Sequence, residues 1–293
     1  MLTETTKGVL AVLGAAVIWG LSPIFYKALS HVPPLDVLSH RMIWSLVFFG
    51  IVLALQGRLT EIPAVFSDRR RTLLIVLASL FIAVNWALFI WAVQVGLTTQ
   101  SSLGYYIYPL LSVLLGRLIF AEKLTGMQWA ALGIVGIAVT VLTVGVGSLP
   151  WVALALAGTF AIYGALKKGL DLGPVLSVTI EVLLVSPIAL LVLWMSNSGG
   201  TPVFGGDLST FLLLAFAGPM TAVPLILFSY GSKRMKMGSV GLILYLNPTL
   251  QFLSAVYLFS EPFSTWHLAA FIMIWLALGI YSASGLRQSR PAV

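Results

Sequence analysis

The sequence predicts an all-α integral membrane protein of ten transmembrane helices, arranged as two inverted five-helix repeats. Of its 293 residues, 59% are hydrophobic and only 9% are charged, and the mean hydropathy is +1.04. A soluble domain carries roughly 25% charged residues, so this chain cannot keep a large surface in water. Its apolar runs are continuous and about 20 residues long, which fits membrane helices and excludes the short alternating strands of a β-barrel.

An internal repeat is the second observation. Four residues of the stretch 101–122 recur 139 positions later: Tyr106, Pro109, Phe120 and Glu122 correspond to Tyr245, Pro248, Phe259 and Glu261. The same offset holds back to residue 83, which indicates a duplication of about 140 residues. We assign residues 1–146 to the first five-helix repeat and 147–293 to the second. Duplicated halves in a membrane chain are typical of transporters whose halves move around a shared site.

The apolar runs predict ten spans joined by short connections, so that neighbouring helices are antiparallel. The first run is no secretory signal peptide, because Lys7 is the only basic residue before it and no clear cleavage site follows. The expected spans are Val9–Leu29, Val37–Leu55, Leu73–Val95, Leu103–Phe120, Trp129–Val146, Trp151–Leu166, Pro174–Trp194, Phe211–Tyr230, Val240–Phe259 and Leu268–Ser284.

The basic residues decide the expected orientation. With both termini in the cytoplasm, fourteen of the sixteen Lys and Arg residues fall in cytoplasmic segments and the outer loops hold none, as the positive-inside rule requires. Five spans per half then insert the second half upside down. The loops agree, since Gln56–Arg71 is basic whereas its counterpart Ser196–Asp207 has no basic residue.

Three charged residues are predicted at membrane depth: Lys27, Arg41 and Glu181. A charge there costs roughly 2.5–3.5 kcal/mol unless it faces a cavity or a partner. Arg41 and Glu181 hold nearly equivalent places in the two halves, at an offset of 140. Two interpretations stay open for them: a structural ion pair or hydrogen-bonded anchor between helices, and a substrate-facing or coupling site. Lys27 is close enough to a span end to reach the interface.

Aromatic and amide side chains gather in the middle of the spans, away from the interface belts where Trp and Tyr usually lie. Mid-span amides need hydrogen-bond partners and avoid lipid. Packing explains any one of these aromatic residues, but their clustering indicates a central cavity for a small amphipathic or aromatic solute. The candidate substrate-binding residues are Trp19, Arg41, Trp44, Asn85, Trp86, Tyr105, Tyr106, Tyr163, Glu181, Tyr245, Asn247 and Gln251.

Six prolines are expected to interrupt spans, because each lacks a backbone donor and weakens the helix locally. They are Pro23, Pro109, Pro187, Pro219, Pro224 and Pro248. Pro109 and Pro248 are matched by the repeat, so we predict them to be gating hinges in opposite halves. The hairpins before them, Val95–Ser102 and Gly231–Ser239, would be the gate tips.

Seven stretches, in order along nearly the whole chain, resemble a known family: IWGLSPIFYKAL (18–29), HRMIWS (40–45), NWALFIWAV (85–93), SLGYYIYP (102–109), YGALKK (163–168), GPMTAVPLILF (218–228) and GLILYLNPTLQFL (241–253). They resemble the EamA-type exporters of the RarD group, in the drug/metabolite transporter superfamily. Tyr108 and Leu244, both at expected cavity positions, depart from the pattern, where Asn and Gln would be expected. The resemblance implies a multi-pass protein of the bacterial inner membrane that exports small metabolites, with aromatic and other neutral amino acids as the leading substrate class.

The predicted function is therefore secondary export by alternating access, with a small solute and the lipid bilayer as partners. The chain has no GxxxxGK[ST] loop for ATP and no cysteine, and we expect no cofactor, no metal, no nucleic acid and a monomer. The alternatives are an exporter of drugs or other metabolites, and an integral membrane enzyme acting on lipid-like substrates. Such an enzyme would need clustered acidic residues, whereas the nine acids here are isolated. A channel fits an occluded inverted repeat poorly.

Overall fold

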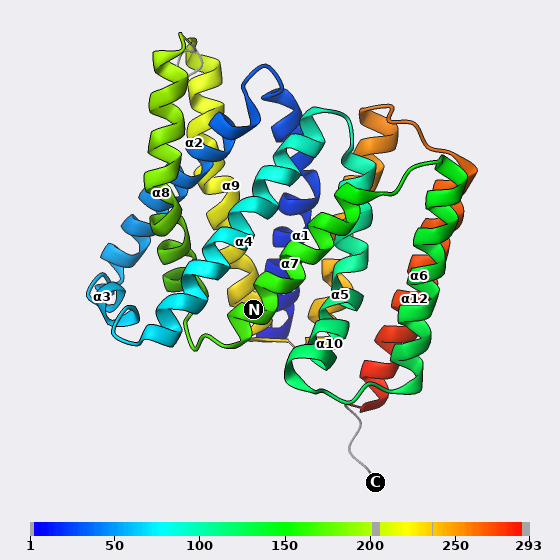
Figure 1. Ribbon diagram of the computed structural model, residues 1–293. Coiled ribbons are helices and arrows are strands. Elements are labelled where there is room, and N and C mark those ends of the chain that lie inside the picture. The colour runs from blue at the N-terminus through cyan, green and yellow to red at the C-terminus, as the bar shows by residue number, and fades with distance from the viewer. Residues whose placement is uncertain (1–2, 201–205, 236, 289–293) are drawn as a thin grey trace.

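The computed structural model describes residues 3–200, 206–235 and 237–288, and over these residues all regular secondary structure is helical (Figure 1). Part of the predicted outer loop 196–207, together with Lys236 and Arg290, lies outside them. The elements are α1 (Glu4–Ala28), α2 (Pro34–Leu55), α3 (Glu61–Val65), α4 (Arg69–Gln94), α5 (Thr98–Phe120), α6 (Gly126–Val146), α7 (Trp151–Lys168), α8 (Pro174–Ser198), α9 (Leu208–Ser232), α10 (Met237–Leu244), α11 (Leu246–Leu253), the π-helical turn η1 (Ser254–Leu258) and α12 (Thr265–Gln288).

Each of the ten predicted spans is helical, which confirms an all-helical membrane protein. Within the described residues, nine helical stretches are long and apolar enough to cross a membrane. The tenth segment, α7, is not among them; it has 18 residues and ends in Lys167 and Lys168. It packs along α4 and α5 like the other helices of the bundle.

Helices that correspond in the two halves begin with corresponding caps. The Asp68 carboxylate accepts the backbone N–H of Arg71 at the start of α4 (2.6 Å), and the Asp207 carboxylate accepts that of Thr210 at the start of α9 (2.9 Å). The two aspartates are 139 positions apart. Each cap satisfies a donor that the first helical turn leaves free.

The starts of α6 and α12 are matched in the same way. The N–H of Thr125 donates to Oε1 of Gln128 (2.9 Å), and the N–H of Ser264 donates to Nδ1 of His267 (3.3 Å). Both residues of the second pair lie 139 positions after those of the first. In each case the third helical residue reaches back to the cap, as in a capping box. Such matching capping contacts at the starts of α6 and α12 are expected if the two halves arose by duplication of one sequence.

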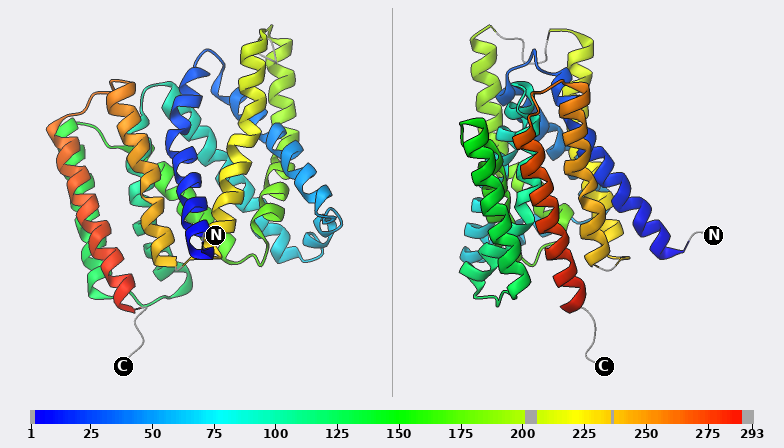
Figure 2. Two further views of the ribbon diagram at one scale, coloured as in Figure 1. Left: turned by 180° about the vertical axis from the view of Figure 1, so that it is seen from behind. Right: turned by 90° about the vertical axis from the view of Figure 1, so that its right-hand side faces the viewer.

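The helix neighbours are also symmetric (Figure 2). α1 packs against α9 and α11, while α7, the counterpart of α1, packs against α4 and α5, the counterparts of α9 and α11. α2 packs against its own counterpart α8, and α6 against its counterpart α12. α1 runs away from the end of the molecule where α12 finishes, and α7 runs toward that end (Figure 1). We call this the termini end and the opposite one the far end.

The predicted effect of the prolines was wrong for five of the six. Helices continue without a break through Pro23, Pro109, Pro187, Pro219 and Pro224. A proline removes only one helical hydrogen bond, and neighbouring helices can hold the rest of the helix in place. Among the described spans only the ninth is divided, at Tyr245, three residues before Pro248. The ninth span then ends in the π-turn η1, which the sequence pattern did not indicate.

Close helix crossings depend on small residues, as is usual inside membranes. A Cβ at Gly104 would lie 2.7 Å from the carbonyl oxygen of Ala153, so α5 and α7 meet backbone to backbone. A Cβ at Gly218 would lie 2.6 Å from the carbonyl oxygen of Trp44, where α9 crosses α2. Large apolar side chains such as Leu118 and Leu190 are exposed instead on the outer faces, where lipid would cover them.

Candidate functional site

Arg41 is buried in α2 and faces aromatic rings. Its guanidinium carbon lies 4.0 Å from the ring centre of Trp86 and 5.7 Å from that of Tyr26. Its Nε donates to the hydroxyl of Thr221 (2.9 Å). Helices α1, α2, α4 and α9 thus converge on one cation, which combines a cation–π contact with a single hydrogen bond to a neutral group.

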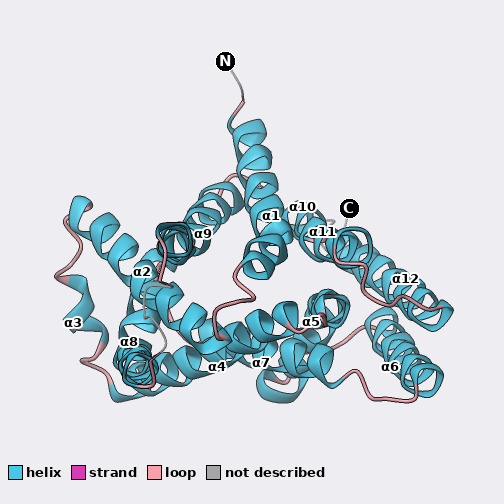
Figure 3. Cartoon of the chain, turned by 90° about the horizontal axis from the view of Figure 1, so that it is seen from above, coloured by secondary structure: helices cyan, strands magenta, loops and turns pink. Residues whose placement is uncertain are grey.

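A row of aromatic rings leads from Arg41 across the molecule. We name it the aromatic row: Tyr26, Phe89, Tyr105, Phe160 and Tyr163. Successive ring centres lie 5.8, 5.8, 5.9 and 5.8 Å apart. The row starts on α1 and then passes through α4, α5 and α7, which lie side by side on the other side of the molecule seen from above (Figure 3). Two of the predicted site residues, Tyr105 and Tyr163, belong to it.

The last ring of the row, that of Tyr163, contacts the second buried charge. The hydroxyl of Tyr163 donates to Oε2 of Glu181 (3.0 Å), and Lys167 Nζ lies 2.6 Å from Oε1 of the same carboxylate. Ser177 also donates to Oε1 (2.9 Å). The Glu181 side chain is 1% exposed and that of Lys167 is 23% exposed. Sequence analysis placed Lys167 among the cytoplasmic charges, but its amine turns back to neutralise Glu181.

Asn85 is fully buried beside the row and joins three helices. Its Nδ2 donates to the carbonyl of Leu156 (2.9 Å) and to the hydroxyl of Thr159 (2.8 Å), both on α7. Its Oδ1 accepts the hydroxyl of Tyr105 on α5 (3.4 Å). With these partners inside the protein, Asn85 acts as a hydrogen-bonded anchor between α4, α5 and α7.

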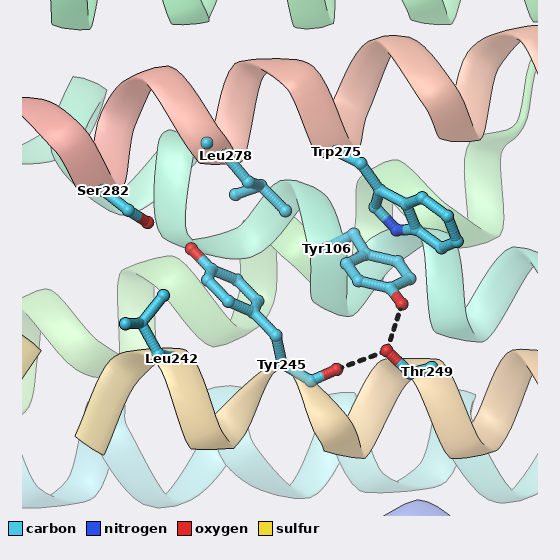
Figure 4. Close-up of a pocket in the computed structure, with 8 residues that line it drawn as sticks. Tyr106, Leu242, Tyr245, Thr249, Trp275, Leu278 and Ser282 are labelled. Atoms are coloured by element: carbon cyan, nitrogen blue, oxygen red, sulfur yellow. Dashed lines mark hydrogen bonds between the residues drawn. The ribbon is translucent and has the colours of Figure 1, made fainter. Parts of the chain in front are cut away.

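A cavity of about 300 Å³ lies between α5, α10, α11 and α12. Figure 4 shows Tyr106 of α5, Tyr245 at the break between α10 and α11, and Trp275 of α12 pointing into it. The Thr249 hydroxyl donates to the backbone carbonyl of Tyr245 (2.7 Å), so the Tyr106 hydroxyl donates to Thr249 Oγ1 (2.6 Å). Ser282 adds a polar group at the cavity wall. Two predicted site residues, Tyr106 and Tyr245, therefore share one cavity.

The two remaining amides interact with each other one turn further along α11. Gln251 Nε2 donates to Oδ1 of Asn247 (2.8 Å), and Gln251 Oε1 accepts the hydroxyl of Ser101 on α5 (3.3 Å). Trp19 and Trp44 lie elsewhere: the Trp19 ring is 6.0 Å from that of Phe228, and the Trp44 ring is 6.1 Å from that of Phe211. The candidate residues thus form several groups rather than one cavity wall.

The role of Glu261, which the sequence indicated only as the repeat partner of Glu122, was not predicted. Its carboxylate is buried and accepts the backbone N–H groups of Thr98 and Thr99 (2.7 Å each) and the Thr99 hydroxyl (2.8 Å). Glu261 therefore caps the first turn of α5 from the connection between η1 and α12. A negative group at a helix start is stabilised by the helix dipole and the free donors. The repeat offset that relates Glu261 to Glu122 was the available signal.

Within the described residues, no three His, Asp or Glu side chains come together in a way that could hold a metal ion. The polar groups that converge are one guanidinium, one Lys–Glu pair, hydroxyls and amides. Such a set can bind and release a solute through hydrogen bonds and charge.

Comparisons with known proteins agree with this arrangement. Residues 6–144 match the EamA-like transporter family. The chain is 39% identical to the uncharacterized transporter YojE of Bacillus subtilis, over 99% of this chain and 98% of that protein. It is 36% identical to an uncharacterized transporter of Vibrio cholerae, over 99% and 96% of the two chains. Protein RarD of Escherichia coli is 33% identical, over 98% and 97%.

A solved structure, described as the crystal structure of a protein, has a similar fold. Its TM-score is 0.63, with 93% of this chain and 96% of that chain covered. The sequence identity is 16%, so the likeness concerns the fold alone.

Proposed function

We propose, since this chain belongs to the EamA-like transporter family of the drug/metabolite transporter superfamily, that it is a secondary transporter which exports small metabolites by alternating access. The family makes it a multi-pass membrane transporter rather than an enzyme, which removes the membrane-enzyme alternative. The direction, the mechanism and the substrate class are the parts that we propose.

The proposal rests on a difference in burial between corresponding residues of the two repeats. At the far end, Glu261 caps α5, and Leu103 on α5 is 1% exposed. At the termini end the counterpart of Leu103 on α10, Leu242, is 53% exposed and lines the cavity. In a transporter that alternates between two conformations, the two repeats are expected to have similar sequences but to pack differently in each conformation.

The charge distribution supports the orientation. The described basic residues outside Lys27 and Arg41 lie in the connections and helix ends of the termini end, for example Arg58, Arg117 and Lys233. By the positive-inside rule the termini end faces the cytoplasm, and because its relatives are bacterial we propose the inner membrane as its location.

The aromatic row supports a substrate that is small and partly aromatic, and we propose neutral or aromatic amino acids as the class. Rings spaced like these offer stacking and edge contacts to an aromatic body. Export of drugs or other metabolites is the second candidate, because the same rings would accept any flat apolar solute. Pro109 and Pro248 keep their proposed role as hinges, now with a break in the helix three residues before the second of them.

Transport by the purified protein in liposomes tests this function. Vesicles are loaded with one radiolabelled amino acid at a time, and efflux is compared with that from vesicles lacking the protein. We expect protein-dependent efflux that needs no ATP, and acceleration when unlabelled solute is present outside. Efflux that requires ATP, or flux that never saturates with solute concentration, would contradict alternating access.

A further inference from the structure

Arg41 is a buried cation without a carboxylate partner in the described structure. Arg41 is only 7% exposed. The chain has nine acidic residues and all of them lie in the described part. The ion pairs found there join Lys7, Arg58, Lys167, Lys168 and Arg234 to acids, and Arg41 is in none of them.

This situation is costly for a guanidinium. An arginine keeps its charge under all ordinary conditions, so it cannot become neutral as a buried lysine can. A buried charge without a counter-charge is strongly unfavourable. The contacts with Trp86 and Tyr26 and one hydroxyl acceptor at Nε offset only part of this cost. The two terminal amino groups of the guanidinium, four N–H donors, are the part suited to a planar two-oxygen acceptor.

In the second half of the chain, the position that corresponds to Arg41 is occupied by a carboxylate. At an offset of 140, Lys27 corresponds to Lys167 and Arg41 corresponds to Glu181. In the second half these positions form a Lys–Glu pair at 2.6 Å. In the first half both positions are cationic, and Lys27 is held by the backbone carbonyls of Val93 and Gln94 instead. The first half therefore has the cations of such a pair but no carboxylate.

We propose that Arg41 binds the carboxylate of the transported solute, and that the solute is therefore an organic anion or zwitterion whose apolar body lies against the aromatic row. That the bound solute is transported rests on the proposed function, whereas the binding of a carboxylate at Arg41 does not. The Trp86 ring lies against the guanidinium, 4.0 Å from its carbon, and Tyr26 begins the row that would take the body of the solute. An inorganic anion such as chloride shares the charge but has no body to contact the rings.

Thermal unfolding of the purified protein in detergent tests the site with matched ligands. Phenylacetate, phenylacetamide and phenethylamine share a ring and differ in charge, and L-phenylalanine and L-phenylalaninamide form a second pair. Ligands that bind the folded state raise Tm, and the stabilisation follows RT ln(1 + [L]/Kd). We expect phenylacetate and L-phenylalanine to raise Tm, with at least tenfold weaker binding of the uncharged or cationic partner. Sodium chloride at equal concentration should have a smaller effect than sodium phenylacetate.

Variants give the second arm. Arg41→Gln should remove the preference for phenylacetate over phenylacetamide, and Arg41→Lys should retain it with weaker binding. Lys27→Gln is the matched control and should leave the preference unchanged. Equal stabilisation by acid and amide, stabilisation by none of the five organic ligands, or an unchanged preference in Arg41→Gln would overturn the proposal. Chloride acting as well as phenylacetate would overturn the assignment of the anion to the solute.

Failure of this inference is separable from failure of the proposed function. Protein-dependent efflux of an amino acid with no acid preference in unfolding would leave the transporter standing and remove the Arg41 site. A clear acid preference without any efflux would leave the Arg41 site and contradict secondary export of that solute.

Discussion

The two ends of the bundle are formed by corresponding residues that pack differently. At the far end, the start of α5 is closed by the buried carboxylate of Glu261. At the termini end the corresponding residue, Glu122, pairs with Lys168 and its side chain is 44% exposed. Leu103 on α5 is buried, whereas its counterpart Leu242 on α10 lines an open cavity.

Under the proposed mechanism, this difference corresponds to two equivalent gates, of which one is closed. If the halves exchanged conformations, Glu122 would cap the start of α10 at residues 237 and 238, which correspond to Thr98 and Thr99. The cavity at Leu242 would then close as a matching space opened at Leu103.

The largest effect is expected from removing the buried cap. Glu261→Ala deletes an acceptor of three hydrogen bonds from donors at the start of α5. Hydrogen bonds to a charged group contribute about 1.5–3 kcal/mol each and do not add fully, so we expect a loss of about 3 kcal/mol in the free energy of unfolding. Glu122→Ala is the matched control and should cost less than about 1 kcal/mol, because its pair is exposed. Equal losses in denaturant unfolding would contradict the asymmetry.

The charge pair of the second half gives the next effect. Glu181→Gln and Lys167→Met should each cost about 2 kcal/mol, because each leaves a largely buried charge alone. The double variant should cost at least about 1 kcal/mol less than the sum of the single ones. The corresponding pair of positions in the first half, Lys27→Gln with Arg41→Gln, should be additive, since neither is the partner of the other. An additive result for Lys167 and Glu181 would show that the pair does not act as a unit.

Substitution of the two proposed hinge prolines, Pro109 and Pro248, should have different effects on this conformation. Pro248→Ala restores a backbone donor next to the break at Tyr245 and should favour a continuous ninth span. We expect it to lower the reactivity of a cysteine at Leu242 several-fold. Pro109→Ala should change little in the same assay, because α5 is already continuous through Pro109. Identical effects of the two substitutions would mean that the prolines only shape packing.

The smallest effect concerns a helix cap outside the membrane. The hydroxyl of Ser209, and the N–H and hydroxyl of Thr210, hold the pKa of Asp207 well below its ordinary value of 3.8. A lowered pKa means that the carboxylate stabilises the folded state above this value and that the contribution is lost as the pH falls below it. Tm should therefore fall less steeply on acidification in Asp207→Asn than in the unaltered protein. An unchanged slope would remove Asp207 from the acid response.

Much of the fold was predictable because lipid imposes simple rules. Continuous apolar runs and the one-sided basic residues were sufficient to predict ten helices. Contacts between distant residues were not predictable in this way. Glu261 reaches Thr98 across 163 positions, and a glutamate in a short polar loop carries no local sign of such a contact.

The charges in the middle show the same limit. Arg41 and Glu181 were recognised by depth alone, which left a structural and a functional interpretation open. The pairing of Lys167 was not predicted, because it precedes Lys168 at the end of an apolar run and both residues resemble solvated cytoplasmic charges. Only the geometry distinguishes them: Lys167 turns to Glu181, and Lys168 turns to Glu122. The division of the ninth span and the short helix α3 were missed because neither has an apolar period of its own.

The central claim is that opening one end closes the other, and cysteine reactivity at two corresponding positions tests it most directly. The chain has no cysteine, so Leu103→Cys and Leu242→Cys can be labelled singly with a small thiol reagent. In the otherwise unaltered protein we predict fast labelling at position 242 and slow labelling at 103. Adding Glu261→Gln weakens the far-end closure and should raise the rate at 103 while lowering the rate at 242. A rise at 103 with no fall at 242 would contradict alternating access, because the far end would then be opening on its own.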